Sequence, residues 1–185
     1  MLRKWDKGID FKIMLNELKD SFIDLIKLYY KKERKKQIAK SILYYSIALI
    51  QLTNGLRASE AVEALKNYIE HNKAVCRVRK RKDNIEREVI IPNLIHLHKP
   101  LLEKIYYEVF NSNIDTNKYK VWCLYNLKTN SHSLRYAFEN YISKKIADTS
   151  LITLFQGRKS LNSHLHYLRY KEAKELVEKE IKKLL

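Results

Sequence analysis

The sequence predicts a mainly α-helical protein with one small antiparallel β-sheet, and three observations lead to this prediction. Apolar residues recur at helical spacing over most of the 185 residues. β-branched residues flank a single polar segment at 80–86, as they do in a β-hairpin. Hydrophobic residues make up 45% of the chain, which is sufficient for a core, and no repeat or low-complexity linker interrupts the sequence. We therefore expect one compact domain.

Two helices are predicted in the N-terminal part of the chain. The first carries an apolar stripe over residues 11–29 and is followed by a charged break at 31–36. The second extends over about 37–53 with one apolar face, and Asn54-Gly55 is a good helix stop. Arg57 is therefore expected just past a turn, where the next helix begins.

The middle of the chain predicts the hairpin and one further helix. Residues 75–79 and 87–91 have the composition of strands, which places Lys82 at or near the hairpin tip. Helical spacing returns at 101–110. The polar run at 111–118 is expected to be a loop.

Three helices are predicted in the C-terminal part. Ser131 is a plausible N-cap for a helix over about 132–144. A short helix at 150–155 is expected to stop at Gly157. A final amphipathic helix occupies 171–185, and its apolar stripe must be buried against another surface.

The charge of the chain predicts a polyanionic partner. Lys and Arg number 37 against 21 Asp and Glu, which gives a formal net charge of +16. Nucleic acid and an anionic membrane both attract such a protein. The membrane is the weaker alternative, because no apolar run approaches the roughly 18 residues of a spanning helix and the N-terminus lacks a signal-peptide pattern. Lysines that are merely solvated remain a third interpretation.

The two cysteines argue for a protein of the cell interior. Cys76 and Cys123 belong to no C-x-x-C or Cys/His cluster, so the sequence predicts neither a disulfide framework nor a zinc site. We expect both to be reduced thiols and the protein to be cytoplasmic.

Several basic residues have the right chemistry for a phosphate site. His132 and Arg135 are three residues apart, so they share one face of a helix, although such a pair is often a capping histidine and a solvated arginine. Two converging arginines, Arg57 and Arg135, would neutralise the oxygens of a pentacoordinate phosphorane through their planar guanidinium groups. Arg57 has an alternative partner in Glu60, and both roles can hold, since a carboxylate can orient the guanidinium.

A tyrosine near the C-terminus is a candidate nucleophile. Tyrosine has an ordinary pKa of about 10, so it needs a cationic surround and a proton acceptor before it can attack phosphorus. His132 is a candidate acceptor. Among the thirteen tyrosines, Tyr167 stands out only by its spacing from Gly157 and Arg158, and Tyr170 is the alternative.

The order of these residues resembles the tyrosine recombinase (phage integrase) family. T-N-G-L-R-A-S-E-A is similar to that family's T-G-L-R-x-S-E box, which makes Arg57 the first catalytic arginine and Glu60 the associated acidic residue. K-D-N-I-E-R-E-V-I-I-P is similar to the hairpin phrase K-G-N-K-E-R-x-V-P, which assigns the catalytic lysine to Lys82. H-S-L-R-Y-A-F is similar to H-x-L-R-H-x-F and gives His132 and Arg135.

The last box of the resemblance contains the nucleophile. L-F-Q-G-R-K-S-L-N-S-H-L-H-Y resembles the family's L-G-H box followed about nine residues later by tyrosine, which assigns the nucleophile to Tyr167. Arg158 occupies the place where the family usually has histidine or tryptophan. The resemblance covers about 40–170, so we expect 37–170 to be the catalytic domain. Residues 1–36, a helix and connector, are too short for the core-binding domain that many family members carry.

The resemblance implies a reaction on double-stranded DNA without a cofactor or metal. Tyr167 attacks the phosphate that Arg57, Arg135 and Arg158 hold, and the product is a 3′-phosphotyrosine. Lys82 protonates the departing 5′-hydroxyl, and His132 assists proton transfer. The implied protein is a site-specific recombinase of a virus or other mobile element.

Two alternative functions and one assembly remain open. A type IB topoisomerase-like enzyme uses similar chemistry to nick and relax DNA, and a DNA-binding module without cleavage would share the basic charge. The resemblance also implies dimers or tetramers on DNA, formed when residues 171–185 pass to a neighbouring protomer. In the free protein we expect this helix to pack on its own chain, and it can equally be an ordinary intramolecular cap.

Overall fold

The computed structural model describes residues 8–31, 35–78, 85–146, 148–156 and 163–184, with side chains in the last range from Ala173 onward. Two strands form an antiparallel sheet, and all other regular elements of this part are helices, so the predicted fold class is confirmed. In chain order the elements are α1 (Phe11–Lys31), α2 (Lys35–Asn54), α3 (Ala58–His71), β1 (Val75–Arg77), β2 (Glu86–Glu88), α4 (Asn93–Leu97), α5 (Lys99–Phe110), α6 (Thr116–Asn126), α7 (Ser131–Ser143), α8 (Thr149–Phe155) and α9 (Ser163–Lys182).

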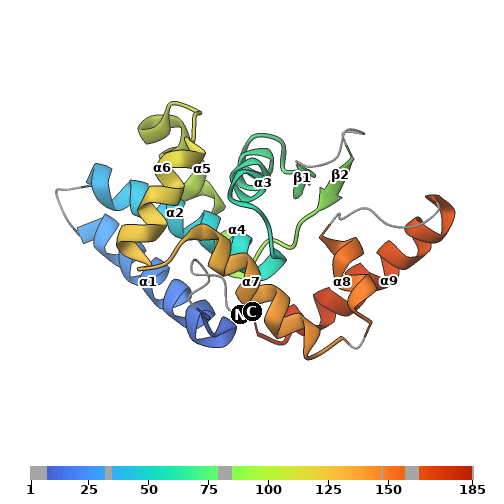
Figure 1. The fold of residues 1–185 in the computed structure, drawn as a ribbon. Helices are drawn as coiled ribbons and strands as arrows, with labels where there is room; N and C mark the ends of the chain where they lie inside the picture. Colours follow the sequence, from blue (N-terminus) through green and yellow to red (C-terminus); the bar gives the residue numbers. More distant parts are fainter. Residues whose placement is uncertain (1–7, 32–34, 79–84, 147, 157–162, 185) are drawn as a thin grey trace.

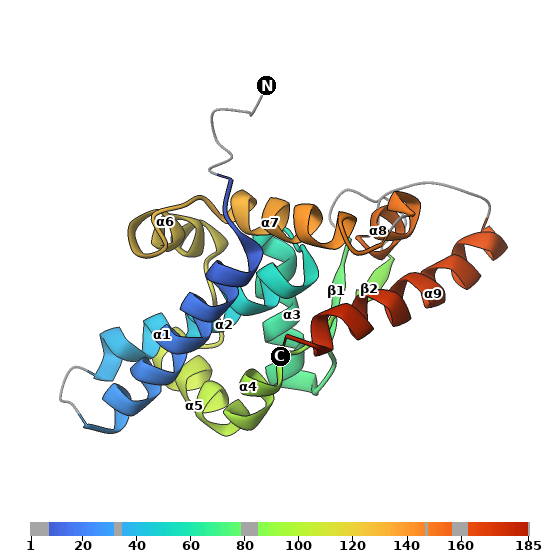
Figure 2. The same cartoon turned by 90° about the horizontal axis from the view of Figure 1, so that it is seen from below.

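α2 is the central helix, and α1, α3, α5 and α7 pack around it (Figures 1 and 2). Its C-terminal part is buried almost all round, including Ile42, Leu43, Ile47 and Ile50 with no exposed surface. Each such side chain contributes about 1.5–3 kcal/mol of burial free energy. The prediction of a single apolar face therefore underestimates how much of α2 is buried, because four neighbouring helices cover its different sides.

The hairpin is confirmed, with strands shorter than predicted. β1 and β2 pair in antiparallel register, with Val75 opposite Glu88 and Cys76 opposite Arg87. Cys76 and Arg87 are both buried on the inner side of this small sheet. The hairpin tip with Lys82 lies outside the described residues.

The region between α5 and α7 differs from the prediction. The expected loop at 111–118 ends early, because Asp115 caps a helix by accepting hydrogen bonds from Asn117 N–H at 2.7 Å and Lys118 N–H at 3.3 Å. The helix that follows, α6, buries only Tyr119 and Cys123, so its sequence has no apolar stripe by which to recognise it.

The start of α7 lies one residue earlier than predicted. Asn130, not Ser131, is the N-cap, and its side-chain oxygen accepts from Ser133 N–H at 2.9 Å. Ser131 is the first helical residue. His132 and Arg135 therefore both lie in the first two turns of α7.

The final helix, α9, begins at Ser163, well before the predicted start at 171. Its C-terminal half packs against α8, with Ala173, Val177 and Ile181 fully buried within this chain. An ion pair joins Lys174 to Glu88, and Lys19 Nζ donates to Leu184 O at 2.5 Å. The expected packing of this helix on its own chain is confirmed, and its exchange between protomers stays a prediction.

Both cysteines are free and buried. Burial raises the pKa of the Cys76 and Cys123 thiols to about 12 in each case, which makes them poor nucleophiles. In the part of the chain that the structure describes, no helix combines the length and apolar character needed to cross a membrane.

Candidate functional site

Arg57 is the N-cap residue of α3 and directly follows the turn that ends α2. Gly55 makes this turn with φ +60°, a left-handed conformation that favours glycine. Leu56 N–H then donates to Gln51 O at 3.2 Å. Arg57 itself is extended, with φ −73° and ψ 156°. The predicted position of Arg57, just past a turn and at a helix start, is confirmed.

Glu60 fixes both the backbone and the side chain of Arg57. Its carboxylate is fully buried, accepts from Arg57 N–H at 2.9 Å and accepts from Arg57 Nη1 at 2.7 Å. The Arg57 side chain nevertheless keeps 22% of its surface exposed. The alternative in which Glu60 binds Arg57 is thus observed, and it leaves the guanidinium accessible to an anion.

The pKa of Glu60 is lowered by its surroundings. Burial raises it, but the hydrogen bond from Arg57 N–H, the charge of Arg87, and the hydrogen bond and charge of the Arg57 guanidinium together outweigh burial. Glu60 therefore stays ionised below the pH at which an ordinary glutamate takes up a proton.

The lowered pKa of Glu60 predicts how stability depends on pH. Between pH 7 and pH 3, the free energy of unfolding should fall more steeply for the wild type than for a Glu60→Gln variant. The stabilising contribution of Glu60 is complete above the ordinary pKa of 4.5 and is lost as the pH falls through the lower folded value. Urea unfolding between pH 7 and pH 3 measures this slope, and Glu175→Gln, at an exposed position of α9, is the control. Equal slopes for wild type and Glu60→Gln would contradict the assignment.

Arg135 converges on the same carboxylate from α7. It is only 3% exposed, and its Nη1 lies 3.9 Å from Glu60 Oε2. Its Nε donates to Glu139 Oε1 at 3.0 Å and its Nη2 donates to Gln156 Oε1 at 2.8 Å. The alternative of a solvated arginine is therefore wrong, since Arg135 is a buried side chain held from three directions.

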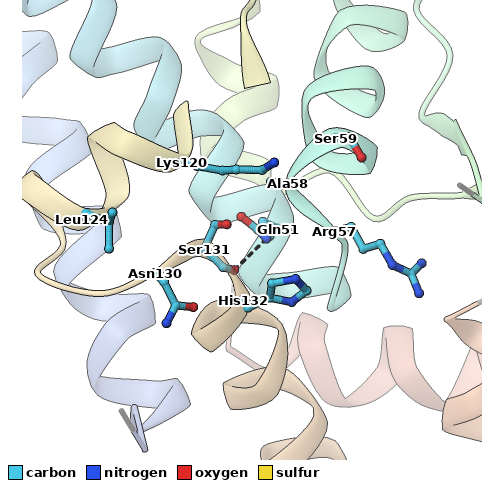
Figure 3. A pocket seen from close by; sticks show the side chains of 9 residues that line it. All are labelled: Gln51, Arg57, Ala58, Ser59, Lys120, Leu124, Asn130, Ser131 and His132. Carbon is cyan, nitrogen blue, oxygen red and sulfur yellow. Dashed lines mark hydrogen bonds between the residues drawn. The ribbon is translucent and has the colours of Figure 1, made fainter. Parts of the chain in front are cut away.

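A hollow of about 630 Å³ opens above these residues (Figure 3). Arg57 and His132 line it at the starts of α3 and α7, and Lys120 extends from α6 toward the start of α3. The Arg57 guanidinium points outward, away from Lys120 and Ser131 (Figure 3). His132 is exposed. The described residues that line the hollow are basic or neutral and include no carboxylate: Gln51, Arg57, Ala58, Ser59, Lys120, Leu124, Asn130, Ser131 and His132. The hollow is suited to an anion such as a phosphate group.

Gln51, which sequence reasoning missed, joins the two helix starts that border the hollow. Its Nε2 donates to Leu56 O at 3.1 Å and to Ser131 O at 2.8 Å, while its Oε1 accepts from Tyr119 O–H at 2.7 Å. The first bond fixes the residue before Arg57, and the second fixes the residue before His132 (Figure 3). The one sequence signal for this role was a glutamine within the apolar run at 47–52.

Arg87 is a second missed residue, and it joins the end of α2 to the end of α8. It is 3% exposed, donates from Nη2 to Asn54 O at 2.9 Å and from Nη1 to Phe155 O at 3.0 Å. Its guanidinium also lies 5.4 Å from the centre of the Phe155 ring. Strand alternation could have located it, because Arg87 is two residues from buried Val89 and so faces inward.

The structure describes no side chain for the remaining predicted residues. Lys82 and Arg158 lie outside the described residues. Tyr167 and Tyr170 fall in the first half of α9, where the backbone alone is described. In both views of the ribbon the N-terminal end of α9 lies at the outer edge of the molecule, away from the starts of α3 and α7 (Figures 1 and 2). Among the residues with described side chains, no three of the types His, Cys, Asp and Glu gather where they could hold a metal ion.

Known proteins resemble the chain over nearly its whole length. "Putative integrase ORF241" of Acidianus two-tailed virus is 31% identical over 179 residues, which cover 95% of this chain and 68% of that protein. "Uncharacterized protein MJ0770" of Methanocaldococcus jannaschii is 28% identical, with 94% and 87% covered. "Putative integrase V10" of Sputnik virophage is 27% identical, with 96% and 90% covered.

No family model matches the chain. No solved structure matches it. Identity above 30% to a relative covered over two thirds of its length shows that the chain belongs to the same integrase family as the Acidianus virus protein.

Proposed function

We propose that this integrase is a site-specific tyrosine recombinase, which cleaves and rejoins double-stranded DNA through a 3′-phosphotyrosine intermediate. The observation that carries the proposal is the convergence of Arg57 and Arg135 on the buried Glu60 carboxylate, beside a hollow that His132 lines and whose described residues include no carboxylate. The net charge of +16 supports a polyanionic substrate. The names of the two viral relatives support an enzyme that integrates DNA.

The chemistry needs stabilisation of a doubly charged phosphorane. Arg57, already oriented by Glu60, binds one non-bridging oxygen with its exposed face. Arg135 supplies a second positive charge from beneath and needs a shift away from its Glu139 or Gln156 contact to bind oxygen directly. Preorganised donors of this kind are the largest single contribution to many enzymatic rates.

The bond changes balance without a cofactor or a metal. The Tyr167 oxygen forms a bond to phosphorus, the bond from phosphorus to the 5′-oxygen breaks, and the tyrosine proton passes to His132. Lys82 gives a proton to the departing 5′-oxygen, and Arg158 donates a hydrogen bond where the family usually has histidine or tryptophan. A free 5′-hydroxyl reverses the step, so strands are exchanged with phosphodiester energy conserved. For this attack the first half of α9 must reach the hollow.

A nicked suicide DNA substrate tests the proposal. The wild type is expected to form a covalent protein–DNA adduct in buffer without metal, and Tyr167→Phe is expected to form none, because phenylalanine lacks the nucleophilic oxygen. Tyr170→Phe is the matched control, three residues along the same helix. Denaturing gel electrophoresis separates the adduct from free protein.

Each other outcome has its own meaning. Loss of the adduct in Tyr170→Phe alone would move the nucleophile to Tyr170. Relaxation of any supercoiled plasmid without site preference would favour the type IB topoisomerase-like alternative. Salt-sensitive DNA binding without an adduct from the wild type would contradict the recombinase proposal and favour a binding module.

A further inference from the structure

A second, smaller hollow adjoins the one beside Arg57. It measures about 370 Å³, and Ser59 lines both hollows. Beyond Ser59, the smaller hollow follows one face of α3 at helical spacing and faces the segment that leads into α6, through Val62, Glu63, Lys66, Asn67, Ser112, Asn113, Ile114 and Thr116. The two hollows therefore form one concave strip between α3 and α6, which we call the α3–α6 strip.

The α3–α6 strip carries a lysine in each hollow. Lys120 lines the larger hollow, and its Nζ makes a 3.3 Å hydrogen bond to Asn117 Oδ1 on the exposed surface of its own helix. Lys66 lines the smaller hollow, and its Nζ lies 3.9 Å from Glu70 Oε1 with 48% of the side chain exposed. An exposed ion pair at 3.9 Å contributes little, and Asn117 is a neutral partner, so both ammonium groups can turn to a phosphate.

The polar groups between the two lysines suit a chain of phosphates better than one small anion. The Ser59 hydroxyl lies where the hollows meet, and amide and hydroxyl side chains line the smaller one. Glu63 is the acidic member, and Arg77 offsets it, since Arg77 N–H donates to Glu63 Oε1 at 3.4 Å and Arg77 Nε lies 3.9 Å away. Two separate cations with hydrogen-bond donors between them match the repeating charge of a sugar–phosphate backbone.

We propose that the α3–α6 strip holds the backbone of the DNA strand next to the phosphate that is cleaved, with Lys120 and Lys66 each bound to a phosphate that does not react. The identity of the polymer rests on the proposed function. The geometry gives the direction: the strand leaves the Arg57 and His132 end of the larger hollow, passes Ser59 and continues along α3 toward Asn67.

The test compares two pairs of substitutions with equal loss of charge. Lys66→Met/Lys120→Met removes both strip cations and keeps most of each apolar stem. Lys118→Met/Lys104→Met is the control, because Lys118 shares α6 with Lys120 and Lys104 is exposed on α5, yet neither lines either hollow. Fluorescence anisotropy with a 30-base-pair duplex gives the binding constant from 50 to 300 mM salt, and thermal unfolding checks that both variants are folded.

The strip variant, Lys66→Met/Lys120→Met, is expected to bind DNA more weakly at every salt concentration. The negative slope of log K, the association constant, against log salt should become shallower by about two, one for each lost phosphate contact. The control should retain the wild-type slope. For Lys66→Met alone, the rate of adduct formation at saturating DNA should stay within about twofold of wild type, because Lys66 lines the smaller hollow and not the one with Arg57 and His132.

The two proposals fail in different ways. An unchanged slope in the strip variant, or an equal fall in the control, would overturn the α3–α6 strip while leaving the Tyr167→Phe result intact. A fall of the Lys66→Met adduct rate at saturating DNA by tenfold or more would also overturn it, because Lys66 would then act on the reacting phosphate. A reduced slope in a protein that forms no adduct would support the strip and sink only the recombinase chemistry.

Discussion

Gly55→Ala should lower the free energy of unfolding by about 2–5 kcal/mol, measured by urea denaturation. Two costs add. An L-residue at φ +60° costs about 1–2 kcal/mol. The new Cβ would overlap Phe138 Cδ1 and approach Gln156 Nε2 to 2.8 Å, and such overpacking costs about 1–3 kcal/mol. The Phe138 ring cannot move aside easily, because it is fully buried and stacks on Phe155 with centroids 6.1 Å apart.

Gly8→Ala separates the two costs. Gly8 has φ +61°, and among the described residues no atom lies within 4 Å of an added Cβ, so this variant tests the backbone cost. Its free energy of unfolding should fall by no more than about 1–2 kcal/mol. Equal losses of unfolding free energy in Gly55→Ala and Gly8→Ala would show that the contact of the new Cβ with Phe138 and Gln156 contributes nothing.

The same contact connects Gly55 to the site. Gln156 Oε1 accepts from Arg135 Nη2, so a Cβ that displaces Gln156 also displaces the guanidinium. Below its melting temperature the folded Gly55→Ala protein should therefore form the adduct more slowly, by up to about 100-fold for a displacement near 1 Å. Gly8→Ala should keep the wild-type rate.

The sequence predicted the helices that have a clear apolar stripe or a clear stop signal, and it missed α6, which has neither. The apolar stripe of α1 was clear because its buried residues Leu15, Leu18 and Phe22 lie on one side of the helix. The stop at Asn54-Gly55 located Arg57. α6 escaped prediction because its burial rests on Tyr119 and Cys123, while Leu124 and Tyr125 are exposed. A helix that packs through Tyr119, Trp122 and Cys123 alone, within one turn, leaves too short a pattern to show a period.

In the candidate site, too, the residues in short sequence phrases were predicted and those with long-range contacts were not. Arg57, Glu60, His132 and Arg135 could be named because each lies in a short phrase of the sequence. The polar residues that hold them could not, since their roles depend on contacts across the fold. Gln51 bonds to Ser131 over a separation of 80 residues. Such buried pairs are decided by tertiary packing, which a single sequence does not display.

Arg87→Met should lower the free energy of unfolding by about 3–6 kcal/mol, because two hydrogen bonds from a charged donor are lost at about 1.5–3 kcal/mol each. The carbonyls of Asn54 and Phe155 would remain buried without these donors. Arg87→Lys should fall between Met and wild type, since an ammonium keeps the charge but lacks the planar fork that reaches two acceptors at once. Urea denaturation measures all three proteins.

Arg77→Met is the matched control on the paired strand. Arg77 is 61% exposed and lies 3.9 Å from Glu63, so its loss should cost less than about 1 kcal/mol. The free energy of unfolding at acidic pH gives a second measurement. Arg87 is among the charges that lower the pKa of Glu60, so Arg87→Met should raise that pKa and move the acid-induced loss of stability to higher pH. Arg87→Met and Arg77→Met proteins of equal stability would contradict the role of Arg87.

Arg87 should also act on the reaction without touching DNA. Its two acceptors, Asn54 O and Phe155 O, belong to the segments that lead into Arg57 and Arg158, and Arg87 itself follows the hairpin tip that carries Lys82. In the proposed reaction these groups bind one phosphate, and a loosened junction would change how often they meet it in the right geometry. At a temperature where Arg87→Met is folded, the adduct rate at saturating DNA should fall, by about tenfold or more, with the DNA dissociation constant within about twofold of wild type. Arg87→Lys should recover part of the rate. A purely structural arginine would change melting temperature alone, and a DNA contact would change the dissociation constant first.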